Sequence, residues 1–132
     1  MDEARERFLR NRVMTATPAQ RIVLLYDRLG LDLTRALAAP DQDTFRSQLS
    51  HALEIVSELL GSLNVSAGGP ADNLAGIYGY AMTELLAARG AHDARRVETV
   101  AGMVTTLREA WAQAADIVDG APQPARAGAW VG

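Results

Sequence analysis

The sequence predicts an all-α fold: an antiparallel four-helix bundle with an N-terminal arm and a disordered C-terminal tail. Hydrophobic residues make up 48% of the 132 residues and aromatic residues only 5%, and much of the apolar content is alanine and leucine, which favours helices over sheets. Four segments repeat apolar residues at helical spacing, and none alternates as a half-buried strand does. The short connections between these segments place successive helices antiparallel.

The first helix is predicted to begin at Pro18 and to end before Ala39-Pro40. Thr17 is the expected N-cap, Pro18 the first helical residue, and Gln20 the N3 residue that completes a capping box. At about 100° per residue, one apolar stripe faces the core. This stripe comprises Ile22, Leu25, Tyr26, Leu29, Leu33 and Leu37.

The first helix also carries apolar residues on its opposite side. Leu24 and Leu31 lie seven residues apart and nearly eclipsed, and Val23 lies toward one flank. A helix with two apolar sides needs two partners. The second partner is either another protein, or the N-terminal arm or a longer helix of this same chain.

The second helix is expected to begin at a cap, Asp41 or Asp43, and to run to about Leu63. It has a single core face, and its polar side includes His51. The core face comprises Phe45, Leu49, Ala52, Leu53, Val56, Leu59, Leu60 and Leu63. Residues 64–71, with Gly68-Gly69-Pro70 at their centre, are predicted to form the longest internal loop.

The third helix is expected to follow a cap at Asp72 or Asn73 and to end near Gly90, a candidate C′ glycine. Its core stripe comprises Leu74, Ile77, Tyr78, Ala81, Met82 and Leu85. The opposite side carries Gly76, Gly79, Thr83 and Ala87, with Tyr80 nearby. Two glycines inside a helix cost about 1 kcal/mol each relative to alanine. Close approach of a partner backbone would offset this cost; tolerated drift or bending of the helix is the alternative.

The fourth helix is predicted from about Asp93 to Val118, with Trp111 among its core residues. Residues 119–132 mix proline, glycine and alanine without a period, which predicts a disordered tail. Trp130 in this tail is interpreted as a solvent-exposed residue without a role in binding. The alternative is that it belongs to a short docking motif. Residues 1–118 would then form one domain that includes an N-terminal arm over residues 1–16.

Composition excludes several classes of protein. The net charge of −3 and the interleaving of Arg5, Arg7, Arg10 and Arg12 with acidic residues argue against a nucleic-acid partner. The chain has no cysteine, so disulfides and thiolate metal sites are absent. We find neither a signal peptide nor an apolar run near the roughly 20 residues of a membrane span. The sequence therefore predicts a cytoplasmic protein without membrane insertion.

No catalytic or cofactor motif is found. His51 shares a helix face with Glu54 and Glu58, but the order is reversed from the Glu-x-x-His pair of carboxylate metal sites and the face is polar. His92 is predicted to lie in a turn without a nearby partner, and Gly68-Gly69 lacks the lysine of a phosphate-binding loop. The prediction is a protein that is not an enzyme and has no metal or cofactor.

Several segments resemble the FliS family of flagellin-specific export chaperones. The resemblance runs from about Phe8 to Trp111 and combines motifs that are weak singly but specific together. These motifs are Phe8 and Asn11, Val13-Met14-Thr15-Ala16-Thr17-Pro18, Leu25-Tyr26-Asp27, Ile77-Tyr78-Gly79-Tyr80-Ala81-Met82, and Leu107-Arg108-Glu109-Ala110-Trp111.

The resemblance implies a cytoplasmic bundle that binds the disordered C-terminal segment of flagellin, prevents premature polymerisation and assists delivery to the export gate of the flagellar type III apparatus. It also implies that the N-terminal segment can lie over part of the client groove. The alternative is a helical-bundle adaptor or regulator that binds another amphipathic helix. The candidate partner-binding residues are Phe8, Val13, Met14, Val23, Leu24, Leu31, Gly76, Gly79 and Tyr80. Oligomeric state does not follow from the sequence.

Overall fold

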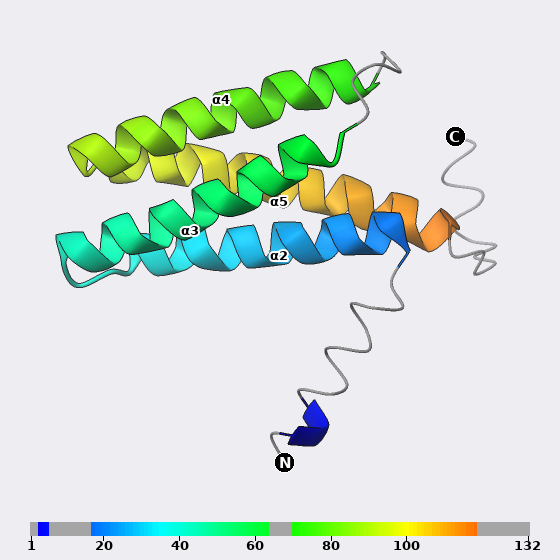
Figure 1. The fold of residues 1–132 in the computed structure, drawn as a ribbon, viewed down its shortest axis with the longest axis horizontal. Helices are drawn as coiled ribbons and strands as arrows, with labels where there is room; N and C mark the ends of the chain where they lie inside the picture. The colour runs from blue at the N-terminus through cyan, green and yellow to red at the C-terminus, as the bar shows by residue number, and fades with distance from the viewer. Residues whose placement is uncertain (1–2, 6–16, 64–69, 119–132) are drawn as a thin grey trace.

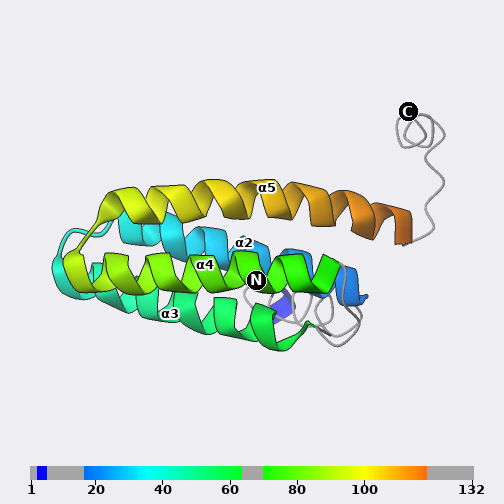
Figure 2. The same cartoon turned by 90° about the horizontal axis from the view of Figure 1, so that it is seen from above.

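The computed structural model describes residues 3–5, 17–63 and 70–118, and within them it confirms the all-α fold. Four long helices follow a single turn of helix at residues 3–5: α2 (Pro18–Leu37), α3 (Gln42–Gly61), α4 (Pro70–Ala91) and α5 (Ala94–Val118). Successive long helices run in opposite directions along the bundle (Figure 1). α2 and α4 each pack against both α3 and α5, so the four helices enclose one core (Figure 2).

The core is built from the predicted apolar stripes of all four helices. Its most completely buried large side chains are Tyr26, Leu29, Leu33, Leu49, Val56, Leu59, Leu85, Val97 and Val100. Several residues differ from prediction, among them Ala36 and Ala88, which are buried although neither belongs to a predicted stripe. Leu37 is 39% exposed, because it is the last residue of α2 and lies at the end of the core stripe. Ile55 is buried, because α3 packs against both α2 and α4 and so buries a wider arc than one stripe.

The predicted start of α2 is confirmed in full. Thr17 accepts a hydrogen bond from the backbone N–H of Gln20 at 3.1 Å, and the Gln20 side chain accepts one from the Thr17 N–H at 3.0 Å. At the start of α3, Asp41 rather than Asp43 is the N-cap, and its carboxylate accepts from the Thr44 N–H at 2.7 Å. Hydrogen bonds from Thr44 lower the pKa of Asp41, and the larger contribution comes from the backbone N–H of Thr44 and the smaller from its side chain.

The predicted start of the third helix is wrong, and so is the role predicted for Gly90, although the helix ends within one residue of it. α4 begins at Pro70, not after a cap at Asp72 or Asn73, and Asp72 lies in its first turn, where a carboxylate interacts favourably with the helix dipole. α4 also continues through Gly90 to Ala91. The left-handed residue that ends it is His92, with φ 53°, and the Asp93 N–H donates to the Ala88 carbonyl at 3.0 Å, as in a Schellman motif.

The ring of His92 has a partner, contrary to prediction. It stacks on Phe45 with ring centroids 4.2 Å apart and planes inclined by 20°. α5 then begins as predicted, with the Asp93 carboxylate accepting from the Arg95 N–H at 3.1 Å. The turn between α4 and α5 is thus anchored to the start of α3.

Other sequence predictions concern residues 1–2, 6–16, 64–69 and 119–132, which lie outside the described residues. They include the arm, the centre of the predicted loop and the tail with Trp130. Within the described ranges, no helix has both the length and the apolar character that crossing a membrane requires.

Candidate functional site

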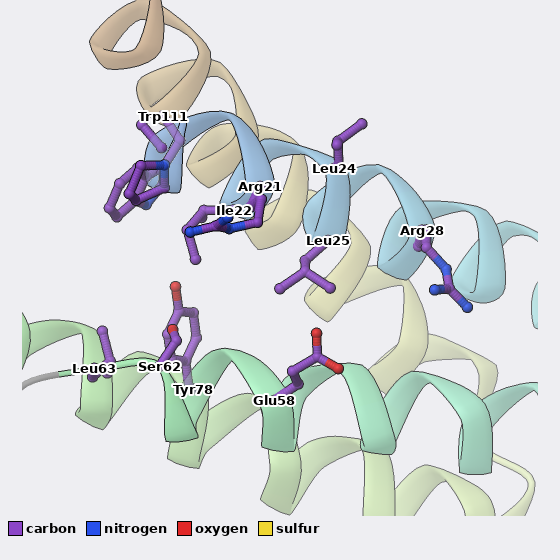
Figure 3. A pocket seen from close by; sticks show the side chains of 12 residues that line it. Arg21, Ile22, Leu24, Leu25, Arg28, Glu58, Ser62, Leu63, Tyr78 and Trp111 are labelled. Atoms are coloured by element: carbon purple, nitrogen blue, oxygen red, sulfur yellow. The ribbon is translucent and has the colours of Figure 1, made fainter. Parts of the chain in front are cut away.

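An apolar groove of about 580 Å³ opens at the end of the bundle where α2 begins. Apolar side chains from α2, α4, α5 and the end of α3 line it: Ile22, Leu24 and Leu25 from α2, Leu63 after α3, Tyr78 from α4 and Trp111 from α5. Figure 3 shows Leu25 and Ile22 directed into the space between α2 and α3. The volume lies within the range typical of ligand pockets, so the groove has room for several apolar side chains.

The groove continues the core stripe of α2 toward the start of the helix. Leu29 and Leu33 are fully buried in the core, whereas Leu25 and Ile22, one and two turns nearer Pro18, are half-buried. Leu24 is half-buried as well, so both apolar sides of the first turns of α2 reach the groove. This end of α2 therefore presents apolar surface that the described helices leave partly uncovered.

Two tyrosines join α2 to α4 beneath the groove. The hydroxyl groups of Tyr26 and Tyr78 share a hydrogen bond of 2.5 Å across the centre of the bundle, and their rings lie 6.5 Å apart at 54°. Burial raises the pKa of both phenols, and the contact with Tyr78 raises that of Tyr26 further, with a smaller opposing effect from a hydrogen bond to Trp111. Both phenols are therefore held in the uncharged form, and Tyr78 contributes its side chain to the lining of the groove.

A chain of polar contacts joins the two walls beside the groove. The Asp32 carboxylate on α2 is buried, 4% exposed, and lies 2.5 Å from Nδ1 of His51 on α3. The other ring nitrogen, Nε2, lies 3.3 Å from a guanidinium nitrogen of Arg28. Because arginine only donates, Nε2 accepts and Nδ1 carries the proton that is donated to Asp32. His51 thus satisfies a buried carboxylate, whereas the sequence indicated only a polar, solvated face.

The polar side chains of the groove lie at its edges. Its polar lining consists of Arg21, Arg28, Glu58 and Ser62, and the Ser62 hydroxyl donates to the Leu59 carbonyl at 2.7 Å. Within residues 3–5, 17–63 and 70–118, no three His, Cys, Asp or Glu side chains gather closely enough to hold a metal ion. An apolar floor between charged rims is suited to binding an amphipathic segment.

The structure distributes the predicted partner-binding residues over several surfaces. Leu24 lines the groove, whereas Leu31, two turns further along α2, is 47% exposed and lies outside its lining. Val23 is half-buried and also outside it. Gly76, Gly79 and the 49% exposed Tyr80 belong to α4 and do not line the groove. Phe8, Val13 and Met14 lie outside the described residues.

Several residues of the groove were not among the predicted partner-binding set. Ile22, Leu25, Tyr78 and Trp111 match the core pattern, so helical periodicity assigned them to the core. Ile22 lies in the second turn of α2, and this position near a helix start is a signal that could have separated it from residues at the centre of the bundle; Tyr78 lies well inside α4 and gave no such signal. The charged rim residues gave no signal, because exposed arginine and glutamate occur on every helix surface.

Comparison with known proteins agrees with this architecture. The family model described as Flagellar protein FliS matches residues 1–118. Flagellar secretion chaperone FliS of Salmonella typhimurium (strain LT2) is 35% identical over 106 residues, which span 76% of this chain and 78% of that protein. The family match includes all four long helices and the groove between them. The chain therefore belongs to the FliS family of flagellar proteins.

Proposed function

We propose that this protein is a cytoplasmic export chaperone that binds the C-terminal segment of flagellin in the groove at the start of α2. Binding there would prevent premature polymerisation of flagellin and assist its delivery to the flagellar type III export apparatus, without a catalytic step. Family membership and the name of the Salmonella relative support an export chaperone role. The observation that carries the proposal is the apolar groove bounded by Ile22, Leu24, Leu25 and Trp111.

The physical basis is folding coupled to binding. A client segment that is disordered alone lacks enough apolar surface to fold, and a preformed groove supplies the missing surface. The cost of ordering the client limits its net affinity. Such an affinity suits a chaperone, because the client must leave again when it is exported.

The N-terminal arm is proposed to compete for the same groove. Pro18 and Ala19, the first residues of α2, line the groove, so the chain enters the bundle beside it. Phe8, Val13 and Met14 provide apolar side chains within ten residues of that point. We propose that these side chains cover part of the groove until a client displaces them.

Titration calorimetry with a peptide from the C-terminus of the host flagellin tests the groove. We expect binding to the native protein and a loss of about tenfold or more on Leu24→Glu, because a carboxylate in an apolar contact must be desolvated. Leu31→Glu, outside the groove lining, tests whether the client continues along α2. Leu86→Glu on α4 is the matched control, because Leu86 is as exposed as Leu31.

Two results would overturn the proposal. One is absence of peptide binding by the native protein, and the other is equal affinity of the native protein and Leu24→Glu. Circular dichroism of each variant shows whether it remains helical. Retained binding of a different amphipathic helix without flagellin binding would favour an adaptor or regulator.

A further inference from the structure

The two walls of the groove carry opposite charge. Arg21 and Arg28 project from α2, and Glu58 projects from α3 toward Leu25 of the opposite wall (Figure 3). The two arginines are seven residues apart, which corresponds to about 10.5 Å along the helix axis. Among the described residues, Arg21 and Glu58 take part in none of the ion pairs. The rim therefore holds charges that the bundle itself does not neutralise.

Arg28 is held at the rim by contacts that extend to the core. Asp32, one turn further along α2, is buried, and His51 donates to its carboxylate while accepting from Arg28. A buried carboxylate is costly unless it is hydrogen-bonded, so Asp32 fixes the orientation of the His51 ring. His51 in turn uses only one of the five N–H donors of Arg28. The remaining donors are available to a ligand that lies in the groove.

We propose that the groove selects its occupant by charge as well as by apolar contact, and that it takes an amphipathic helix with carboxylates along the flank that faces α2. This inference rests on the proposed function, since it describes the client segment that the groove would bind. Carboxylates two turns apart on the client would meet Arg21 and Arg28, because helices lying side by side share the same rise per residue. A basic or neutral flank would face Glu58.

The charge asymmetry also fixes the direction of the client helix. A helix can enter an apolar groove in either direction with its apolar face inward, but reversal exchanges its two flanks. In the reversed orientation the acidic flank would face Glu58 and the other flank would face the two arginines. Like charges placed together disfavour that arrangement, so one direction is selected.

Titration calorimetry with the host flagellin C-terminal peptide tests the proposal on the full chain. For Arg21→Glu/Arg28→Glu we expect affinity to fall about tenfold or more, because two charge-assisted contacts are lost. Arg28→Gln, which removes the charge without reversing it, should give a smaller loss. Arg35→Glu is the matched control: Arg35 lies on α2, seven residues beyond Arg28 and outside the groove lining, and its replacement should leave affinity within about twofold.

Salt dependence provides a second readout. Salt screens exposed charges, so added salt should weaken binding to the native protein and have less effect on Arg21→Glu/Arg28→Glu. His51 is a positioning residue, so His51→Ala should lower affinity in the native protein and have no further effect in the Arg28→Gln background. A merely structural role of His51 would give the same loss in both backgrounds and would contradict the positioning role.

The outcomes separate this inference from the proposed function. If Leu24→Glu abolishes binding while the double arginine variant binds like the native protein with the same salt dependence, the groove binds the client and charge recognition is wrong. If the native protein does not bind the peptide, both proposals are overturned. Loss of binding in the arginine variants together with a reduced salt dependence supports charge recognition.

Discussion

Two polar contacts inside the bundle link residues far apart in the sequence. The Tyr26 and Tyr78 hydroxyls connect α2 with α4, and Asp32 and His51 connect α2 with α3. Within the described residues, no buried side-chain nitrogen or oxygen lacks a hydrogen-bond partner. These pairs therefore satisfy polar groups at positions where an unpaired group would be costly. Each pair also fixes the relative position of two helices.

The tyrosine pair predicts a loss of stability at alkaline pH. The pKa of each phenol is raised in the folded protein, so their contribution to stability is complete below the unfolded pKa of 10.0 and is lost as pH rises above it. The free energy of unfolding should fall by up to about 1.4 kcal/mol per pH unit for each tyrosine. Urea unfolding at a series of pH values above 9.5, chosen as roughly the onset of tyrosine ionisation, measures this slope.

The composition of the chain leaves few other groups that could contribute to this pH dependence. All thirteen basic residues are arginine and the chain has no cysteine, so few other side chains titrate in the same range. In a Tyr80→Phe background, tyrosinate absorbance reports only on Tyr26 and Tyr78, and it should appear together with unfolding. Tyrosinate absorbance that develops while the helices remain intact would contradict the prediction.

Removal of His51 should destabilise the bundle. His51→Ala leaves the buried Asp32 carboxylate without its donor, and we expect a loss of about 1 to 3 kcal/mol in the free energy of unfolding. Glu54→Ala, an exposed acidic position on the same helix, should change it by less than about 0.5 kcal/mol. Equal stability of both variants in urea would show that solvent satisfies Asp32 when the imidazole is absent.

At the scale of the elements, α4 departs most from a simple amphipathic helix, whereas α2 is strongly amphipathic and carries extra leucines outside its core stripe. The structure places the two leucines on the side of α2 opposite its core stripe in different surroundings. Leu24 lines the groove, whereas Leu31 is exposed. α4 has apolar residues around much of its circumference, including the exposed Tyr80 and Leu86. The capping box at Thr17 predicted the start of α2 correctly, whereas α4 begins without the predicted cap. Asp72 and Asn73 are also suitable caps by residue type, yet α4 begins at Pro70, so a capping residue alone does not locate the start of a helix.

Two explanations of the glycines in α4 can be tested against each other: a partner backbone approaches this face closely, or the glycines have no function and are merely tolerated. A Cβ atom at Gly76 or Gly79 would meet nothing within 4 Å, so alanine at either position should raise the free energy of unfolding by about 0.5 to 1 kcal/mol. If a client backbone approaches this face, the same variants should bind the flagellin peptide more weakly. Urea unfolding and calorimetry on the same preparations measure both effects.

Gly102 on α5 provides the control for this experiment. The space that an alanine methyl group would occupy there is also open, so Gly102→Ala should be stabilising to a similar degree and should leave peptide affinity unchanged. If Gly76→Ala and Gly79→Ala stabilise the protein without changing its affinity for the peptide, the glycines have no role in binding and are merely tolerated.

At the scale of the whole molecule, the groove lies where the first turns of α2, the end of α3 and the side chains of Tyr78 and Trp111 converge. A partner bound there contacts all four helices. Its binding energy therefore adds to the stability of the bundle as a whole, because a ligand that binds only the folded state shifts the unfolding equilibrium. Chaperone and client are expected to stabilise each other.

Deletion of residues 1–14 tests whether the arm competes for this groove. We expect the truncated protein to bind the flagellin peptide roughly three- to tenfold more tightly, because a competitor that fills the groove most of the time reduces the apparent affinity by the free fraction. Calorimetry on both proteins measures the difference. Weaker binding would make the arm part of the binding surface, and unchanged affinity and stability would contradict any contact between arm and groove.

Periodicity and caps determined the number, order and approximate length of the long helices, because these features depend on residues within one or two turns of each other. The resemblance of five short motifs indicated the family before the bundle was known. Tertiary structure alone decided that Asp32 meets His51, that Tyr26 meets Tyr78 and that half-buried residues at the start of α2 bound a groove. Those contacts join residues 19 and 52 positions apart, and they depend on the register of antiparallel helices. That register is set by the packing of the entire core, which no local pattern contains.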